Sequence, residues 1–550
     1  MIMKIVGAAV ENCVHVAGIL AFLGIARDLG YETVFLGPAT PVDKLLGAAV
    51  EAKAEIVAIS YRLTPSVARE IFKQIEEKIP KYGLEDRKFI FGGTPAVAEV
   101  AKEFKFFDRV FSTEGQREII EYLKGKDKKQ AFHIPAQNLI ERIKENDPYP
   151  LIRHHFGLSS LDQTIEGIEK ISDSQVLDVI SLAPDQNTQQ FFFEPDKMNK
   201  SLDGAGGVPI RSEEDFKKLY NATRRGNYPL MRVYSGTTHL IKMAELLQRT
   251  VKNAWAAIPI SWYNELDGRS DRKFVEAVRE NFEAIKWHAD RGIPVEINEP
   301  HQWGLRNAHD TLFVAMAYLS AYVAKKLGVK NYIAQYMFNT PPGLSPKMDL
   351  AKMMAAKEMI ESLISNDFNV ITEARPGLMA FPADLDEAKG QLAFSISETM
   401  FIKPQIVHVV AFTESDHAAN ADEVIESSKI ARKVIEESLK GLPNIWKDKE
   451  IVERIKILKS EVKILLDAMR LLSKNEDPFL DPQTYDSALR LGYLDTPNFI
   501  GSSIAKGLVS TAIIKGSCEV VNPKTGEVIR EKERLESIRK HLPGFVRPDR

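Results

Sequence analysis

The sequence has little cysteine, no long hydrophobic run and almost no excess of either charge. Only two cysteines, Cys13 and Cys518, occur among its 550 residues, which excludes a disulfide framework and predicts a reducing, cytoplasmic location. No apolar run reaches the roughly 18 residues that a membrane-spanning helix needs, and no secretory leader is recognisable. The formal net charge of −3 gives no electrostatic basis for binding nucleic acid or an anionic membrane. We therefore expect a soluble globular protein that binds neither.

Residues 1–125 show short, almost continuous apolar runs separated by amphipathic helical stretches. Such runs are typical of strands buried on both faces of a parallel sheet, and their alternation with helices predicts a doubly wound, flavodoxin-like α/β domain. In such domains ligands bind at the carboxyl ends of the strands. The expected strands are KIVGAAV (4–10), ETVFLG (32–37), EIVAISYRL (55–63), KFIFGG (88–93) and RVFSTE (109–114).

Residues 165–440 continue the alternation long enough to predict a (β/α)8 TIM barrel. The eighth strand has no clear position, and 394–402 is its candidate. Active sites of such barrels lie at the carboxyl ends of the strands, where several runs end in polar residues that could equally form ion pairs or helix caps. These residues are Asp185, Arg232, Glu299, Arg375 and Glu414. The seven placed strands are QVLDVISLAP (175–184), LMRVYSG (230–236), NAWAAIPIS (253–261), GIPVEINEP (292–300), NYIAQYMFNT (331–340), FNVITEARPG (368–377) and IVHVVAFTE (406–414).

The remaining segments are interpreted as connections and an appendage. Residues 126–164 are expected to be a linker and wrap, because the charged run KGKDKKQ at 124–130 breaks the pattern. Residues 441–550 begin with long charged helices and end in a predicted hairpin, CEVVNPKTGEVI at 518–529. We read this last part as an α+β appendage packed on the barrel.

Three polar motifs follow strands of the first domain: CVHVAG (13–18), SYRLTPS (60–66) and GGTP (92–95). Parallel strands present their carboxyl ends at one edge of a sheet, so the three loops are expected to form one slot. A phosphate site would favour glycines and free amides nearer the helix start. A histidine in this position instead suits metal ligation through a ring nitrogen, although it also suits an ordinary helix start.

These motifs resemble the cobalamin-binding domain of methionine synthase and the B12-dependent mutases, whose signature is DxHxxG followed by SxL and GG. The resemblance implies that His15 is the lower cobalt ligand and that Gly18 leaves room for the displaced nucleotide tail. It implies contact of the cofactor with the residues Cys13, Ser60, Leu63, Thr64, Gly92 and Gly93.

Two positions depart from this signature. Cys13 stands where the family has an aspartate that hydrogen-bonds the histidine, and losing such a partner typically weakens a metal site about 10- to 100-fold. Arg62 stands where SxL has an apolar residue. Three interpretations of His15 therefore remain. It is a cobalt ligand with a weakened hydrogen-bond partner, it lies in a site that is degenerate or binds cobalamin without histidine ligation, or it is a plain helix-start residue.

The second half resembles the barrel subunit of glutamate mutase (methylaspartate mutase), so the chain resembles a single-chain fusion of both mutase subunits. The resemblance implies that Arg232 in PLMRVYSGT clamps a substrate carboxylate and that Glu299 in EINEP contacts a substrate amino group or relays a proton. Lys200 falls where the family has another arginine, and Arg375 adds a cation at a strand end. Three further segments resemble parts of the family's sequence: GLMAFPADLDEAKG, GYLDTPNF and NPKTGEVI.

Other features of the barrel match the family less closely. The family's lysine after the last strand is absent, and VVAFTESDH stands in its place, with Glu414 and His417 as candidates for its contact. His288, His301 and His309 match no standard zinc spacing and are expected to be polar rim residues.

The function expected from the sequence is an adenosylcobalamin-dependent carbon-skeleton isomerase that acts by radical rearrangement on a small acidic substrate. A corrinoid methyltransferase and a non-catalytic cobalamin-binding protein are the alternatives. A homodimer is the expected assembly.

Overall fold

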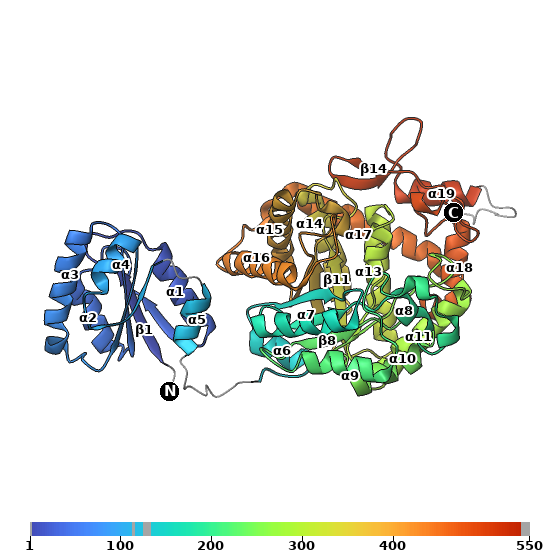
Figure 1. Cartoon of the computed structure of the whole chain (residues 1–550). Helices are drawn as coiled ribbons and strands as arrows, with labels where there is room; N and C mark the ends of the chain where they lie inside the picture. The colour runs from blue at the N-terminus through green and yellow to red at the C-terminus, as the bar shows by residue number, and fades with distance from the viewer. Residues whose placement is uncertain (1–2, 113–115, 125–133, 541–550) are drawn as a thin grey trace. The chain divides into compact units, whose positions relative to one another are not determined.

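A computed structural model describes residues 3–112, 116–124 and 134–540 (Figure 1). The chain divides into two compact units, Met1–His133 and Ile134–Arg550. Each unit has its own hydrophobic core. Within the described residues, no helix is both long and apolar enough to cross a bilayer.

The first unit is a five-stranded parallel sheet with helices on both faces, as the sequence predicts. Its strand order is β2-β1-β3-β4-β5, the order of flavodoxin-like folds. Helices α1 and α5 cover one face, and α2, α3 and α4 cover the other (Figure 1). The strands are β1 (Lys4–Ala9), β2 (Glu32–Phe35), β3 (Ile56–Tyr61), β4 (Lys88–Gly93) and β5 (Phe107–Phe111). The helices are α1 (Ala17–Asp28), α2 (Val42–Glu51), α3 (Pro65–Lys78), α4 (Pro95–Ala101) and α5 (Gln116–Lys124).

The order of the strands creates a switch point between β1 and β3. The chain leaves β1 toward β2 on one side and leaves β3 toward β4 on the other, so the loops after β1 and β3 diverge and leave a crevice. These two loops carry the first two polar motifs, and the third motif follows β4 beside them. The fold therefore places all three motifs along one edge of the sheet.

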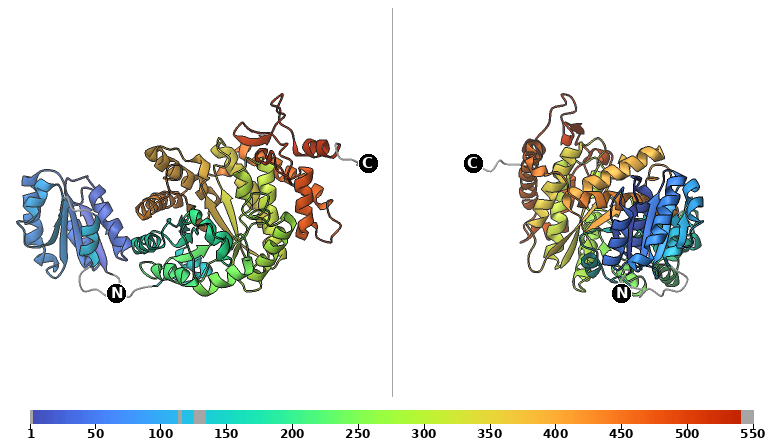
Figure 2. Two further views of the ribbon diagram at one scale, coloured as in Figure 1. Left: turned by 45° about the vertical axis from the view of Figure 1, so that its right-hand side comes forward. Right: turned by 90° about the vertical axis from the view of Figure 1, so that its left-hand side faces the viewer.

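The second unit contains an eight-stranded, nearly closed parallel barrel, with helices on the outside (Figures 1 and 2). Its strand order is β8-β7-β6-β13-β12-β11-β10-β9. The strands are β6 (Leu151–Phe156), β7 (Val179–Leu182), β8 (Leu230–Val233), β9 (Ala256–Ala257), β10 (Val295–Glu296), β11 (Asn331–Met337), β12 (Asn369–Arg375) and β13 (Ile406–Val409). The helices that precede, separate and follow these strands include α6 (Leu139–Asn146), α7 (Leu161–Ser174), α8 (Gln186–Phe191), α9 (Glu213–Ala222), α10 (Leu240–Thr250), α11 (Phe274–Ala289), α12 (Pro300–Gly304), α13 (Asp310–Lys326), α14 (Pro346–Glu361), α15 (Leu385–Thr399) and α16 (Ala421–Leu439).

The strand that the sequence analysis left unplaced is β6, and the candidate at 394–402 is wrong. That candidate lies in the end of α15 and the short 3-10 turn Met400–Ile402. β6 instead comes from LIRHHF, inside the segment interpreted as a linker. The strand was not predicted because its arginine and two histidines interrupt the continuous apolar run by which a buried strand is recognised.

The interior of the barrel is built in layers, because alternate residues of a strand point to the same side. The lowest layer is apolar and comes from Leu151, Val179, Leu230, Ile333, Ile371 and Ile406. Two residues further along the same strands lies a polar and charged layer of Arg153, Ser181, Arg232, Gln335, Glu373 and His408, all at most 4% exposed. The next step on four of these strands brings His155, Tyr234, Met337 and Arg375 to the barrel mouth.

The carboxyl-terminal segment packs on the outside of the barrel as an appendage. It consists of α17 (Lys449–Arg470), α18 (Pro482–Leu491), α19 (Glu531–Lys540) and the hairpin of β14 (Thr511–Ile514) and β15 (Ser517–Val520). This hairpin lies earlier than the predicted one, because Lys515 and Gly516 both have positive φ and form its two-residue turn. The predicted 518–529 segment contributes β15 and a turn closed by the Val521–Val528 bridge.

One buried arginine ties the appendage to the barrel. Arg454 of α17 donates to Asp310 of α13 at 2.8 Å and to Glu519 of β15 at 2.6 Å. The backbone N–H of Cys518 also donates to Asp310 at 3.3 Å. Arg454 and Asp310 are at most 6% exposed, so this network lies largely out of water.

Replacing Arg454 with methionine is expected to lower the free energy of unfolding by about 3–5 kcal/mol, because it leaves buried carboxylates without their partner. Urea unfolding followed by circular dichroism measures the change. The control is Lys459→Met, also on α17, which removes a half-exposed pair with Glu358 of α14 and should cost at most about 1 kcal/mol. Equal losses in both variants would contradict this account of the network.

Candidate functional site

The loop after β1 holds Cys13 inside and His15 outside. The N–H of Cys13 donates to the Val10 carbonyl at 3.0 Å, and the Cys13 carbonyl accepts from the Ala39 N–H at 2.9 Å. Cys13 is fully buried, whereas His15 is exposed. The Cys13 Sγ lies 4.0 Å from His15 Nδ1, so the sulfur faces one ring nitrogen and leaves Nε2 for a ligand.

Beside this loop, between the sheet and α1, lies a slot of about 360 Å³. Its interior is apolar, and small residues form its edges. It is lined by Gly18, Ile19, Ala21, Phe22, Ala58, Ile59, Ser60, Arg62, Ile90, Phe91, Gly92, Gly93, Thr94, Pro95, Phe111, Ser112 and Ile119. The structure thus brings four predicted residues together in one cavity: Gly18, Ser60, Gly92 and Gly93.

Leu63 and Thr64, which were also predicted to contact the cofactor, do not line this slot. Leu63 packs against the hydrophobic core, and Thr64 is the residue that precedes α3. The glycine pair after β4 serves two purposes. A Cβ on Gly93 would lie 2.4 Å from the Tyr61 carbonyl oxygen, whereas a Cβ on Gly92 would meet nothing within 4 Å. Gly93 therefore lets two strand ends approach, and Gly92 keeps the slot open.

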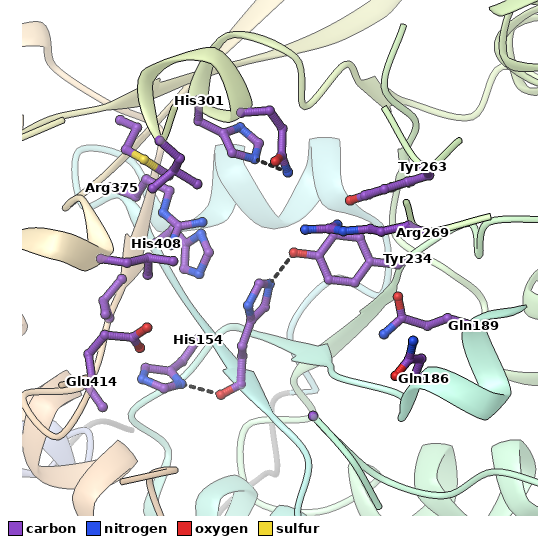
Figure 3. A pocket seen from close by; sticks show the side chains of 18 of the residues that line it. His154, Gln186, Gln189, Tyr234, Tyr263, Arg269, His301, Arg375, His408 and Glu414 are labelled. Atoms are coloured by element: carbon purple, nitrogen blue, oxygen red, sulfur yellow. Dashed lines mark hydrogen bonds between the residues drawn. The ribbon is translucent and has the colours of Figure 1, made fainter. Parts of the chain in front are cut away.

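The barrel mouth contains a second cavity, of about 600 Å³ (Figure 3). Its side chains come from the ends of at least five strands and from the loop after β7. Among the residues that line it are His154, His155, Gln186, Gln189, Tyr234, Tyr263, Arg269, His301, Arg375, His408 and Glu414. Figure 3 shows Arg375 and Arg269 on opposite sides of the cavity.

A charged network lies beneath this cavity. Glu296 accepts from Arg232 at 2.9 Å, from the Trp255 indole at 2.8 Å and from Gln335 at 2.9 Å. Arg153 makes a close ion pair with Glu373 and lies 3.5 Å from Glu296.

The two carboxyl groups of this network differ in their proton affinity. Burial alone would raise the pKa of Glu296, but Arg232 and Arg153 outweigh it and lower this pKa to about 2. For Glu373 burial dominates over the attraction of Arg153 and raises the pKa to about 7.

The four histidines of the cavity are neutral at physiological pH. Burial, together with nearby arginines, lowers the pKa of His154 to about 4 and that of His301 to about 3. The same causes hold the pKa values of His155 and His408 well below their usual range. Neutral imidazoles donate and accept hydrogen bonds without adding charge. The described residues contain no cluster of three or more His, Cys, Asp or Glu side chains suited to a metal ion.

Two arginines line the cavity: the half-exposed Arg269, which lies beside Asp267, and the deeply buried Arg375. Arg375 is 6% exposed, its Nε donates to the Pro376 carbonyl at 3.3 Å, and it forms no ion pair with any described carboxylate. Burying a cation without an anionic partner costs free energy, and a bound carboxylate would supply that partner through two parallel hydrogen bonds.

The other three predicted barrel residues have different surroundings. Arg232 is fully buried below the cavity, where it is paired with Glu296. Glu299 accepts hydrogen bonds from the backbone of Ile260 and Ser261 and from the Trp303 indole, so both its oxygens are engaged. Lys200 is exposed in the loop after α8 and does not line the cavity. The structure therefore gathers only Arg375 of the four at the cavity.

Sequence reasoning missed most of the polar cavity. His154 and His155 lie in the overlooked β6, and His301 was expected only at the rim. A period of two could have found His155: in LIRHHF, as in NVITEAR, an apolar residue, a charged residue and a second polar residue follow at steps of two. This pattern does not include His154 or His301.

Comparison with known proteins identifies the first unit. Residues 3–118 match the model of the B12 binding domain. A solved cobalamin-binding protein from Desulfitobacterium hafniense DCB-2 is 29% identical, with 22% of this chain and 57% of that protein covered and a TM-score of 0.20. No curated protein matches the chain significantly.

Two further solved structures are similar over longer stretches. A rubisco-like protein from Burkholderia fungorum is 12% identical over 59% of this chain and 70% of its own, with a TM-score of 0.34. The cobalamin-dependent S-adenosylmethionine radical enzyme OxsB is 10% identical over 88% of this chain and 83% of its own, with a TM-score of 0.19.

The chain is thus a B12-binding domain followed by a TIM-like barrel with a small carboxyl-terminal hairpin. The slot fits a corrinoid: it has apolar walls for a flat base, open space at Gly18 and Gly92, and an exposed histidine on the adjoining loop.

The glycine pair gives a matched test of the slot. Gly93→Ala is expected to lower the free energy of unfolding by about 1–3 kcal/mol, because its Cβ meets backbone. Gly92→Ala should stay within about 0.5 kcal/mol of the wild type but weaken cobalamin binding, because its methyl group enters the slot. Urea unfolding and visible-absorption titration measure the two effects. Wild-type stability of Gly93→Ala would refute the close approach.

The pKa of Glu373 predicts a pH-dependent stability. The folded protein holds this proton up to about pH 7, whereas an ordinary glutamate releases it near 4.5. Between these values this group makes folding less favourable as pH rises. In Glu373→Gln that contribution disappears, which changes the slope by up to about 1.4 kcal/mol per pH unit. Urea unfolding from pH 5 to 7.5 measures it, with the exposed Glu166→Gln as control. Parallel profiles for all three proteins would show that Glu373 is ionised throughout.

Proposed function

We propose that the protein is an adenosylcobalamin-dependent isomerase that rearranges the carbon skeleton of a small acidic substrate. The supporting observation is that a B12-binding domain shares one chain with a barrel whose cavity holds the unpaired guanidinium of Arg375. Bound adenosylcobalamin supplies the radical chemistry of such reactions. The chain has to bind, orient and shield the substrate.

His15 is the proposed lower ligand of the cobalt. Its exposed position leaves Nε2 available, and the Cys13 sulfur at 4.0 Å faces Nδ1. A thiol is a weaker hydrogen-bond partner than a carboxylate, so the Cys13 sulfur orients the His15 ring less firmly than an aspartate would. The slot beside it takes the displaced nucleotide tail.

Arg375 is the proposed substrate clamp. Its Nε is engaged by Pro376, which leaves the two terminal amino groups to bind one carboxylate side by side. The neutral His301 and His408 donate or accept hydrogen bonds at the remaining polar atoms of the substrate. Deep burial of these groups excludes water, which protects reactive intermediates.

Arg232 and Glu299 are proposed to support the site rather than touch the substrate. Arg232 is held by Glu296 in the layer below the cavity. Glu299 fixes the segment after β9 through the backbone of Ile260 and Ser261, close to Tyr263 of the cavity wall. Lys200, exposed on the loop after α8, keeps a proposed role as an outer cation for the acidic substrate.

The proposal is tested first on the cofactor. The purified protein is titrated with adenosylcobalamin and photolysed, and electron paramagnetic resonance of the resulting cob(II)alamin is recorded. We expect nitrogen superhyperfine splitting from a protein imidazole, lost in His15→Ala. Tight binding without that splitting would remove His15 from the lower face of the cobalt.

The second test concerns turnover. Dicarboxylic acids and amino acids are screened for isomerisation, and Arg375→Met is expected to lower kcat/KM about 10- to 100-fold while cofactor affinity stays unchanged. Arg269→Met should lose less, because Arg269 already has Asp267 at 3.6 Å and stacks on Tyr263. Cofactor binding with no turnover of any acid would favour a non-catalytic binder, and methyl transfer from methylcobalamin would favour the methyltransferase.

A further inference from the structure

The slot of the first unit contains a single charged residue. Of the described residues that line it, only Arg62 carries a charge, and the others are aliphatic, aromatic, small or hydroxylated. Phe22, Ile90 and Phe111 form part of the apolar interior, and each is at most 7% exposed. A ligand that fills this space has an apolar body and at most one group that requires a cation.

Arg62 lies at the open end of the slot. It follows the last residue of β3, so it stands at the carboxyl edge of the sheet near the His15 loop. Its neighbours are fixed: Tyr61 is fully buried and donates to Asn12 at 3.1 Å, and Leu63 packs against the core. The side chain of Arg62 itself is exposed and forms no hydrogen bond or ion pair with any other described residue.

A guanidinium in this position selects an anion at the entrance of an apolar slot. Arginine binds phosphate through two parallel hydrogen bonds, which gives geometric selectivity as well as charge. The nucleotide tail of a complete corrinoid also combines an apolar body with one anionic group. It has a flat apolar base at its end and one phosphodiester where the tail joins the ring system. With the base among Phe22, Ile90 and Phe111, the phosphodiester lies toward the open end, where Arg62 stands.

We propose that Arg62 binds the phosphate group of the corrinoid tail and makes this domain selective for corrinoids whose tail carries that phosphate. The proposal rests on cobalamin binding by the first unit, not on the isomerase reaction. It gives a role to the one charged position of the slot, where the related signature has an apolar residue. Arg62 is a specificity-determining residue in this account and takes no part in bond breaking.

The test compares three ligands that differ in the tail. Isothermal titration calorimetry measures the affinity for adenosylcobalamin, adenosylcobinamide phosphate and adenosylcobinamide, of which only the last lacks phosphate. In Arg62→Leu we expect the affinity for the first two to fall about 10- to 100-fold and that for adenosylcobinamide to change less than about twofold. Arg62→Lys should restore part of the loss, because lysine keeps the charge without the planar fork.

Controls separate this effect from folding and from general charge. Lys44→Leu removes one positive charge from α2, on the opposite face of the sheet, and should leave all three affinities unchanged. Raising the salt concentration should weaken phosphate-bearing ligands more in the wild type than in Arg62→Leu. Inorganic phosphate at millimolar concentration should not displace adenosylcobalamin, because it lacks the apolar base.

Each remaining outcome decides the matter. An equal loss for all three ligands in Arg62→Leu would overturn the proposal and assign Arg62 to the shape of the slot. No loss for any ligand would show that the guanidinium does not reach the phosphate. If the wild type bound no corrinoid, cobalamin binding and this proposal would fail together. Selectivity for the tail without turnover of any acid would leave this proposal standing and overturn the isomerase.

Discussion

The barrel depends on one carboxylate, that of Glu296. Its two oxygens accept from Arg232, Trp255 and Gln335, and Arg153 lies 3.5 Å away. These partners come from opposite sides of the barrel, so a single group near its axis links strands that make no contact in the sheet. Charges removed from water cost several kcal/mol each unless they are paired, and removing one partner leaves the others uncompensated. The charged layer at the floor of the cavity is therefore held in place as a unit. It also fixes the positions of the polar groups that lie above it on the same strands.

The cavities of the two units differ in polarity. The slot of the first unit is almost wholly apolar, and its one guanidinium stands at the entrance. The barrel cavity is rich in polar groups, yet its histidines stay uncharged because burial and arginines suppress their protonation. The positive charge of this cavity therefore comes from its arginines, Arg375 and Arg269, rather than from its histidines. In the proposed function, the first unit holds a large cofactor by shape, and the barrel holds a small substrate by charge and hydrogen bonds.

Sequence periodicity predicted the architecture wherever strands are apolar, and it failed where their interior faces are polar. The five strands of the first unit and seven of the barrel are confirmed, whereas LIRHHF was overlooked because its interior residue is Arg153. The slot could be predicted because parallel strands end at one edge, which places Ser60 and Gly92 together without any knowledge of side-chain contacts. The surroundings of Arg232 and Glu299 could not be predicted. A position at a strand end fixes neither the depth at which a side chain lies nor the neighbour that forms its hydrogen bonds.

The apolar layer at the bottom of the barrel limits how molecules enter and leave the cavity. Leu151, Ile333, Ile371 and Ile406 are at most 1% exposed and fill the interior below the charged layer, so the barrel is closed at that end. A molecule in the cavity has one route in and the same route out. In the proposed reaction, any group that shields the mouth has to withdraw before the product departs, and the next molecule arrives only afterwards. The turnover rate of such a blind-ended chamber cannot exceed the rate at which its entrance is uncovered, however fast the chemistry inside it.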